Sequence, residues 1–289
     1  MATGREWVQG ARPRTLPAAV APVLVGTGAA AQLGAASPGR AVLAGVVALA
    51  LQVGVNYAND YSDGLRGTDL DRVGPMRLTA SGTAAPGSVR LAAFGAFGVA
   101  ALAGLALVAW SGQWWLLAVG AAAILAAWFY TGGRRPYGYR GLGEVGVFVF
   151  FGLVATLGTT YTQAGGLSWP AWCGAVGTGL LACALLMANN LRDIPTDTVT
   201  GKRTLAVRLG DRRARFAYRW LVLVPLLLGA ACAFAAPWAL LVALLAAPAA
   251  ALVVGVRAGA RGIALVPVLA GTGLLQLGYG VLLGLGLAL

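Results

Sequence analysis

Two clusters rich in Asn and Asp interrupt this otherwise apolar chain, one over residues 56–71 and the other over residues 189–204. In each cluster an Asn precedes the first Asp by four residues, and a further Asp follows three or four residues later. These positions are Asn56, Asp60 and Asp63 in the first cluster and Asn189, Asp193 and Asp197 in the second. Carboxylates are costly beside a bilayer unless they pair, hydrate or bind something. Aspartate oxygens suit Mg²⁺, which often bridges a protein to phosphates, so the clusters predict a metal and diphosphate site.

The spacing within each cluster predicts that its side chains share one face of a helix. Asn56, Asp60 and Asp63 stand at i, i+4 and i+7, which point in a similar direction on a helix. The second cluster has nearly the same spacing, with Pro195 expected to loosen the backbone just before Asp197. Two such stripes facing one another would hold two Mg²⁺ ions, with water and a diphosphate supplying the remaining ligands. Salt bridges to neighbouring arginines are the alternative, but two matched copies in a chain with nine acidic residues favour metal binding.

Basic residues beside the acidic clusters are the second part of this prediction. Lys202, the only lysine, follows Asp197 by five residues and has Arg203 next to it. A compact ammonium and a forked guanidinium together suit the oxygens of a diphosphate. Membrane topology alone would also place basic residues here. Further candidate diphosphate donors are Arg66, Arg134 and Arg135.

The rest of the chain predicts an all-α, polytopic membrane protein that forms a single domain over residues 1–289. It is 59% hydrophobic and 10% charged, with a mean hydropathy of +0.78, whereas soluble domains carry about 25% charged residues. Apolar runs of the length that spans a bilayer recur, and they are uniformly apolar instead of alternating, which favours helices over strands. We expect about nine transmembrane helices, over residues 15–36, 40–60, 91–110, 114–131, 144–164, 170–190, 216–235, 238–256 and 264–288, with large polar loops at 61–90 and 191–215.

Charge placement predicts the orientation of these spans. With nine spans, all acidic residues and all but one of the 21 basic residues lie on the side of the N-terminus, the exception being Arg40. The positive-inside rule then places the N-terminus in the cytoplasm and the C-terminus outside the cell membrane. The same rule explains the net charge of +12 without nucleic acid as a partner. The absence of histidine excludes His–metal sites and Ser–His or Cys–His catalysis.

Several stretches resemble the UbiA superfamily of intramembrane prenyltransferases over the full chain. They are the two aspartate clusters, residues 11–17 (ARPRTLP), 130–133 (YTGG) and 141–146 (GLGEVG). Within the superfamily they look most like the branch that prenylates 1,4-dihydroxy-2-naphthoate. The resemblance implies Mg²⁺ as cofactor and a polyprenyl diphosphate as the other substrate. It carries the metal pattern to Asn56, Asp60, Asp63, Asn189, Asp193 and Asp197, diphosphate binding to Lys202 and to Arg134 or Arg135, and acceptor contacts to the segment that contains Tyr139.

The reaction that this resemblance implies is an electrophilic aromatic substitution with loss of CO₂ from the ring. Metal and basic side chains would draw charge from the departing diphosphate, and the ring carbon would attack the allylic cation. Asp69 or Glu144 is expected to orient or deprotonate the aromatic hydroxyl. Three alternatives stay open. They are another acceptor such as 4-hydroxybenzoate, a transporter, which would place acids on both faces, and a Mg²⁺-dependent phosphotransferase of CDP-alcohols, whose single compact acidic motif is absent.

Overall fold

The computed structural model describes residues 2–68 and 76–289, and the described residues form helices without strands. Four long helices and one shorter helix make up most of the N-terminal half and the centre of the bundle. They are α2 (Pro17–Gln32), α3 (Pro38–Arg66), α4 (Pro86–Ser111), α5 (Leu116–Phe129) and α8 (Trp169–Val199). The C-terminal part contributes α9 (Leu205–Ala231), η5 (Pro237–Leu245), α10 (Ala246–Arg257) and α11 (Leu265–Ala288). The prediction of an all-helical protein is therefore confirmed.

Shorter elements complete the chain at both ends of these helices. The N-terminus forms α1 (Gly4–Gly10) and the 3₁₀ turn η1 (Pro13–Thr15). The remaining short elements are the 3₁₀ turn η2 (Tyr137–Arg140), α6 (Gly143–Val147), the π-helical η3 (Phe148–Val154) and α7 (Ala155–Ala164). The last three run on as one apolar helix over 143–164.

The number of candidate membrane spans is close to the expected nine. Within the described residues, seven helices are long and apolar enough to cross a membrane. The segments Gly4–Thr15 and Pro17–Gln32, bent by 51° at their junction, make an eighth together. The shorter apolar helix α5 occupies the remaining predicted run, 114–131. Multiple apolar helices of this kind make the chain a multi-pass membrane protein.

The helices that carry the two acidic clusters extend further than the sequence predicted. Helix α3 continues to Arg66 and α8 continues to Val199, so the expected loops 61–90 and 191–215 begin later than predicted. Pro195 lies inside α8 and does not end it. Neighbouring helices and side chains can satisfy the backbone groups that a proline frees in a membrane protein. Gly67, in the left-handed conformation with φ 70°, ends α3.

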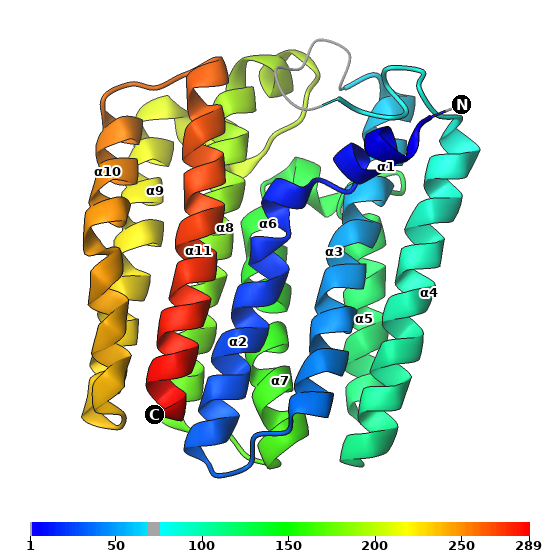
Figure 1. Ribbon diagram of the computed structural model, residues 1–289. Helices are drawn as coiled ribbons and strands as arrows, with labels where there is room; N and C mark the ends of the chain where they lie inside the picture. Colours follow the sequence, from blue (N-terminus) through cyan, green and yellow to red (C-terminus); the bar gives the residue numbers. More distant parts are fainter. Residues whose placement is uncertain (1, 69–75) are drawn as a thin grey trace.

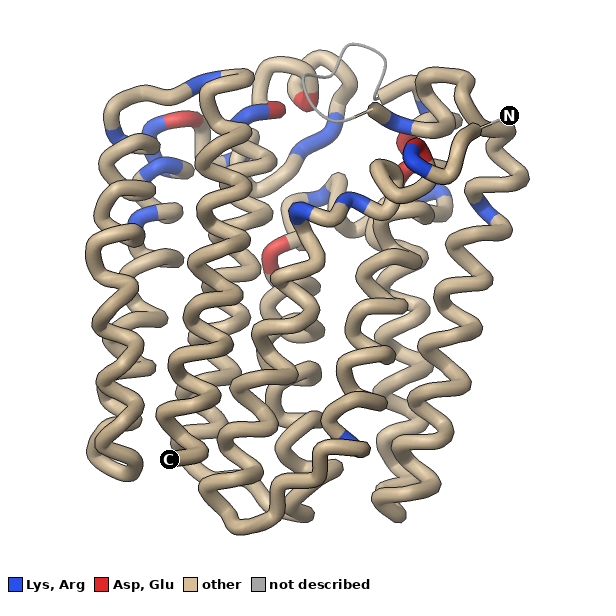
Figure 2. Tube along the Cα trace, viewed as in Figure 1, with Lys and Arg blue, Asp and Glu red and all other residues tan. Residues whose placement is uncertain are grey.

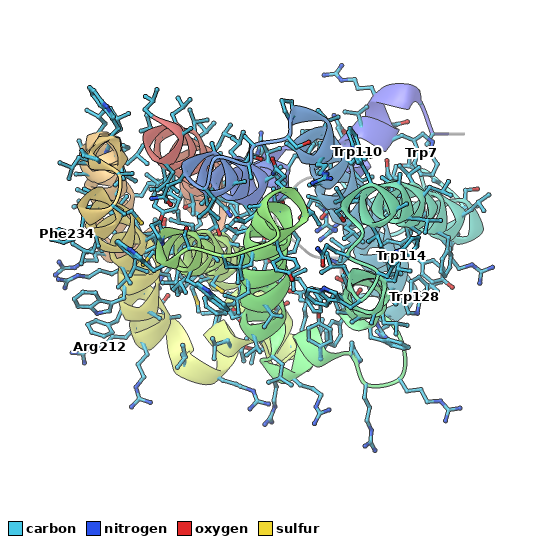
Figure 3. All side chains as sticks on the ribbon, turned by 90° about the horizontal axis from the view of Figure 1, so that it is seen from below. Trp7, Trp110, Trp114, Trp128, Arg212 and Phe234 are labelled. Carbon is cyan, nitrogen blue, oxygen red and sulfur yellow. The ribbon has the colours of Figure 1, made fainter. Side chains whose placement is uncertain are left out.

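The helices stand side by side, with nearly all of the described charged residues toward one end of the bundle (Figures 1 and 2). The two chain termini lie at opposite ends, as an odd number of spans requires (Figure 1). Helix α8 is the most deeply buried span, whereas the large apolar side chains of the outer helices are exposed. In Figure 3, Trp110, Trp114 and Trp128 lie on the side of α4 and α5, and Phe234 lies at the opposite edge. This distribution fits a bundle whose perimeter faces lipid.

At the end away from the charges, one arginine joins three helices. Arg40, near the start of α3, donates to the carbonyl oxygens of Trp110 on α4 at 3.0 Å and of Thr162 on α7 at 3.1 Å. Its guanidinium also lies 5.9 Å from the centre of the Trp110 ring. A cation is stabilised at helix C-termini, where carbonyl groups lack helical partners. Arg40 therefore fixes the ends of α4 and α7 to the beginning of α3.

Candidate active site

A cavity of about 970 Å³ lies between the helices and extends from the charged end into the bundle. Away from the charged end its wall is apolar and comes from α3, α4, α5 and η3, with Leu105, Ile124, Phe150 and Val154 among the lining residues. π-Helical turns such as η3 are frequent at functional sites. The polar lining residues include Gln9, Arg12, Arg14, Gln52, Asn56, Asn59, Asp63, Arg77, Asn189, Asn190, Arg192 and Lys202. The cavity thus has one polar, cationic end and a long apolar remainder.

The two acidic clusters meet at Lys202. Its Nζ lies 3.8 Å from Oδ2 of Asp63 on α3 and 4.0 Å from Oδ1 of Asp197 on α8. The chain turns back after α8 because Gly201 has φ 76° and the Lys202 amide donates to the Asp197 carbonyl at 2.8 Å. Both carboxylates are buried, and the lysine is half-buried. Two helices that are far apart in sequence therefore direct carboxylates at one positive charge.

Tyr139 links this centre to the η2 turn. Its hydroxyl donates to Oδ1 of Asp63 at 2.7 Å, and Lys202 Nζ lies 5.0 Å from the centre of its ring. The Tyr139 carbonyl accepts from the amide of Arg203 at 3.0 Å, which fastens the segment after α8 to η2. Burial, with the nearby Asp63 carboxylate, raises the pKa of Tyr139 above its ordinary value. The phenol therefore keeps its proton and continues to donate to Asp63.

The first stripe does not point in one direction as expected. Asp60, fully buried, accepts from the backbone amides of Leu78 at 2.9 Å and Thr79 at 2.8 Å. Asn56 donates to the carbonyl of Ala11 at 2.8 Å and contacts the N-terminal segment. Because a helix turns about 100° per residue, positions four apart differ by about 40° and one turn in height. That difference is enough for Asn56, Asp60 and Asp63 to find three different partners.

Arg192 contacts the two members of the second stripe that lie nearer the membrane interior, Asn189 and Asp193. Its Nε and one terminal nitrogen donate to the two carboxylate oxygens of Asp193 at 2.7 and 2.8 Å. The same terminal nitrogen donates to Oδ1 of Asn189 at 2.9 Å. Arg192 also lines the cavity, although it was not among the predicted site residues. This side chain adds a cation to the polar end of the cavity.

The other predicted basic residues differ in their placement. Arg66 donates to the carbonyl oxygens of Thr131 and Gly133, and its guanidinium lies 5.4 Å from the Tyr139 ring centre. The side chains of Arg134, Arg135 and Arg203 are exposed and make no hydrogen bond or ion pair with any described residue. Asp69 lies outside the described residues.

Two amides at the site were missed from the sequence. Asn59 lines the cavity, and its Oδ1 accepts from the Thr131 hydroxyl at 2.8 Å. It precedes Asp63 by four residues, as Asn189 precedes Asp193, so the same spacing would have found it. Asn190 also lines the cavity and donates to Glu144 at 3.2 Å. This contact joins residues 46 apart, and no spacing rule reveals it.

The residues present suit a hard divalent cation. Across residues 2–68 and 76–289, no group of three or more Asp, Glu, Cys or His side chains is arranged to hold a metal. However, Asp63 and Asp197 already converge on one cation, the ammonium of Lys202. Mg²⁺ commonly binds through one or two carboxylates and takes its remaining ligands from substrate phosphates and water. The donor set therefore fits Mg²⁺ bound together with a diphosphate.

Known proteins resemble this chain in sequence over most of its length. The model of the UbiA prenyltransferase family matches residues 19–262. A 1,4-dihydroxy-2-naphthoate octaprenyltransferase from Mycobacterium tuberculosis is 57% identical over 278 residues, covering 96% of this chain and 94% of that protein. The protein of the same name from Escherichia coli is 43% identical and covers 72% of this chain and 70% of its own length.

Solved structures show the same fold at low sequence identity. A UbiA homologue from Archaeoglobus fulgidus, bound to DMAPP and Mg²⁺, superposes with a TM-score of 0.71 at 15% identity, covering 98% of this chain and 99% of that one. A UbiA homologue from Aeropyrum pernix gives a TM-score of 0.72 at 15% identity, covering 94% and 96%. The chain belongs to the UbiA prenyltransferase family.

Proposed function

We propose that this protein transfers a polyprenyl group from an all-trans polyprenyl diphosphate to 1,4-dihydroxy-2-naphthoate, with release of diphosphate and CO₂, in menaquinone biosynthesis. The observation that carries this is the cavity, in which a cationic end with two carboxylates continues into a long apolar space. A prenyl diphosphate has the same division into a charged head and an apolar tail. The names of the relatives from M. tuberculosis and E. coli support the naphthoate as acceptor.

We infer that the protein binds Mg²⁺ through the two acidic clusters. Asp63 and Asp197 are the first candidates because both already face Lys202. The other predicted ligands are Asn56, Asp60, Asn189 and Asp193. Each carboxylate oxygen of Asp60 already accepts from one loop amide, so a metal at Asp60 would use the remaining lone pair of an oxygen that the loop orients. When bound, Mg²⁺ offsets negative charge on the diphosphate and so assists its departure.

The chain's own cations have a complementary role in this proposal. Lys202 and Arg192 line the polar end of the cavity and would donate to diphosphate oxygens. Charge-assisted hydrogen bonds of this kind are stronger than neutral ones, and they stabilise the negative charge that grows as the C–O bond breaks. Arg66 lies close by but is bonded to two carbonyls, so it shapes the η2 segment more directly than it reaches the ligand.

The apolar wall has two consequences for the reaction. It receives the isoprenoid tail, and burial of each methylene contributes about 0.8 kcal/mol to binding. It also keeps water away from the allylic carbon. An allylic cation formed there meets the aromatic ring before it meets a water molecule, which favours transfer over hydrolysis.

A competition experiment tests the proposed function. Purified protein is incubated with Mg²⁺, a long-chain all-trans prenyl diphosphate, and equal concentrations of 1,4-dihydroxy-2-naphthoate and 4-hydroxybenzoate. Demethylmenaquinone and CO₂ are the expected products. Exclusive prenylation of hydroxybenzoate would contradict the acceptor, while the absence of transfer to any aromatic compound would contradict the proposed activity.

A further inference from the structure

A buried carboxylate lies behind one of the amides that line the cavity. Glu144, in the first turn of α6, is 7% exposed, and its Oε1 accepts from Nδ2 of Asn190 on α8 at 3.2 Å. Its second oxygen, Oε2, is shielded from solvent and has no hydrogen-bond partner among the described residues. Asn190 lines the cavity, whereas Glu144 does not. The pair is therefore layered, with the amide toward the ligand space and the carboxylate behind it.

This layering determines which end of the Asn190 amide faces the cavity. Oε1 of Glu144 accepts from Nδ2 of Asn190, so the NH₂ group of the amide faces Glu144. The carbonyl oxygen Oδ1 is then directed away from Glu144, on the side of the cavity. In the described part of the chain no donor is bonded to Asn190 Oδ1. The structure thus presents a hydrogen-bond acceptor to whatever occupies the cavity at this level.

Along the axis of α8, Asn190 lies between the charged and the apolar parts of the cavity, and this depth is called the Asn190 level below. Asn190 precedes Asp197 by seven residues on α8, a rise of about 10 Å toward the membrane interior. One turn further along the same helix, Leu185 and Leu186 form part of the apolar lining. A diphosphate bound near Lys202 with its tail in the apolar part would place its allylic carbon close to Asn190. The aromatic ring that attacks this carbon must lie at the Asn190 level.

Two tyrosine rings line the cavity beside the turn that carries Glu144. Tyr130 and Tyr137 line the cavity, with ring centres 5.4 Å apart in an edge-to-face arrangement. The α6 turn that carries Glu144 packs against both rings, because a Cβ on Gly143 would lie 3.2 Å from the Tyr130 hydroxyl and one on Gly146 would lie 2.8 Å from the Tyr137 hydroxyl. Burial raises the pKa of Tyr137 to about 12, so its hydroxyl stays neutral beside a bound ring.

We propose that Asn190 accepts a hydrogen bond from a ring hydroxyl of the aromatic substrate, and that Glu144 is the positioning residue that holds the Asn190 amide in the orientation this requires. The inference rests on the proposed function and adds to it the contact that orients the acceptor. The bond fixes the rotation of the ring about its own plane, and therefore which ring carbon faces the allylic carbon. Glu144 touches neither substrate.

Steady-state kinetics with each substrate varied in turn tests this inference. Asn190→Ala and Glu144→Ala should each lower kcat/KM for the aromatic substrate about tenfold, the effect of one hydrogen bond. KM for the prenyl diphosphate should not change. Glu144→Gln keeps a carbonyl oxygen that can accept from Asn190, and it should recover most of the wild-type value. The double variant should be no worse than Asn190→Ala alone, because Glu144 acts through Asn190.

Gln276→Ala is the matched control. Gln276 is a buried amide on α11 that donates to the Thr178 carbonyl at 3.3 Å and does not line the cavity. Its removal should leave both KM values unchanged. If Glu144→Ala does not fold, the kinetics of Asn190→Ala and Glu144→Gln still test the roles proposed for the two residues.

The outcomes separate this inference from the function on which it rests. Wild-type transfer with unaltered acceptor kinetics in Asn190→Ala would overturn the inference alone. A loss in Glu144→Gln as large as in Glu144→Ala would show that Glu144 acts through its charge or proton and not by orienting the amide. A wild-type protein that prenylates no aromatic compound would overturn the proposed function and the inference together.

Discussion

Asp63→Asn is the most direct perturbation of the shared centre, because it removes a charge and keeps a hydrogen bond. The remaining amide oxygen can still accept from Tyr139, which now bonds Asp63 at 2.7 Å. The carboxylate lies 3.8 Å from Lys202 Nζ. At an effective dielectric constant of about 20, a unit charge pair at this separation has a gross Coulomb attraction of about 4 kcal/mol. Both the lysine and a bound metal would therefore lose a large electrostatic partner.

A loss of about 4 kcal/mol of transition-state stabilisation corresponds to a fall of roughly 10³-fold in kcat. The measurement is the rate of prenylated product formation at saturating substrates and in excess Mg²⁺. Asp211→Asn is the matched control, because Asp211 pairs with Arg215 at 2.8 Å on α9 and does not line the cavity. Its kcat should not change. A folded Asp63→Asn protein with near wild-type turnover would refute the assignment of Asp63 to the site.

Neighbouring residues lead to predictions about stability, pH dependence and membrane topology. Asp60→Asn leaves one of two loop amides without its carboxylate partner. The variant should therefore lose about 1–3 kcal/mol of unfolding free energy and should also turn over more slowly. A thermal unfolding temperature equal to that of wild type would contradict those hydrogen bonds. Because burial raises the pKa of Tyr139 above the value of its unfolded state, its contribution to stability is complete below pH of about 10 and is lost as the pH rises from there through the folded-state pKa. Tyr139→Phe should therefore lose less thermal stability than wild type between pH 9 and 11 (about one unit either side of the ordinary pKa), and parallel curves would refute this. Finally, if the charged end faces the cytoplasm, an impermeant thiol reagent outside intact cells should label a cysteine at Ala36 and not one at Thr200, in a background in which the native cysteines are replaced; the reverse pattern would invert the topology.

Hydropathy predicted the helical spans well because each apolar run has to be long enough for the bilayer. Hydropathy placed the ends of α3 and α8 too early. A helix can continue beyond the apolar run to positions near the interface, where carboxylates such as Asp63 and Asp197 cost less free energy. The run of apolar side chains ends at the interface, whereas the hydrogen bonds of the helix backbone continue past it. The predicted loops were therefore too long.

The site was predictable where contacts are local in sequence and not where they depend on packing. Lys202 returns to Asp197 through one tight turn, which five residues of spacing suggest. Its approach to Asp63 depends on how α3 and α8 pack, and the sequence gives no distance for that. The partners of Asp60 are backbone amides of a loop, which have no residue type to recognise.

The attachment of three helices at Arg40 has a mechanical consequence. Helix α4 is 26 residues long, a length of about 39 Å, and its end at Trp110 is fixed to α3 while its other end lies among the charges. The part of α4 that lines the cavity runs from Ala100 to Val108, within about 15 Å of this fixed end. The other two helices that Arg40 joins also line the cavity nearby, at Ala44 on α3 and Thr159 on α7. Separation of these helices to admit a longer tail would break the hydrogen bonds of Arg40, so this one side chain limits the space at the tail end of the cavity.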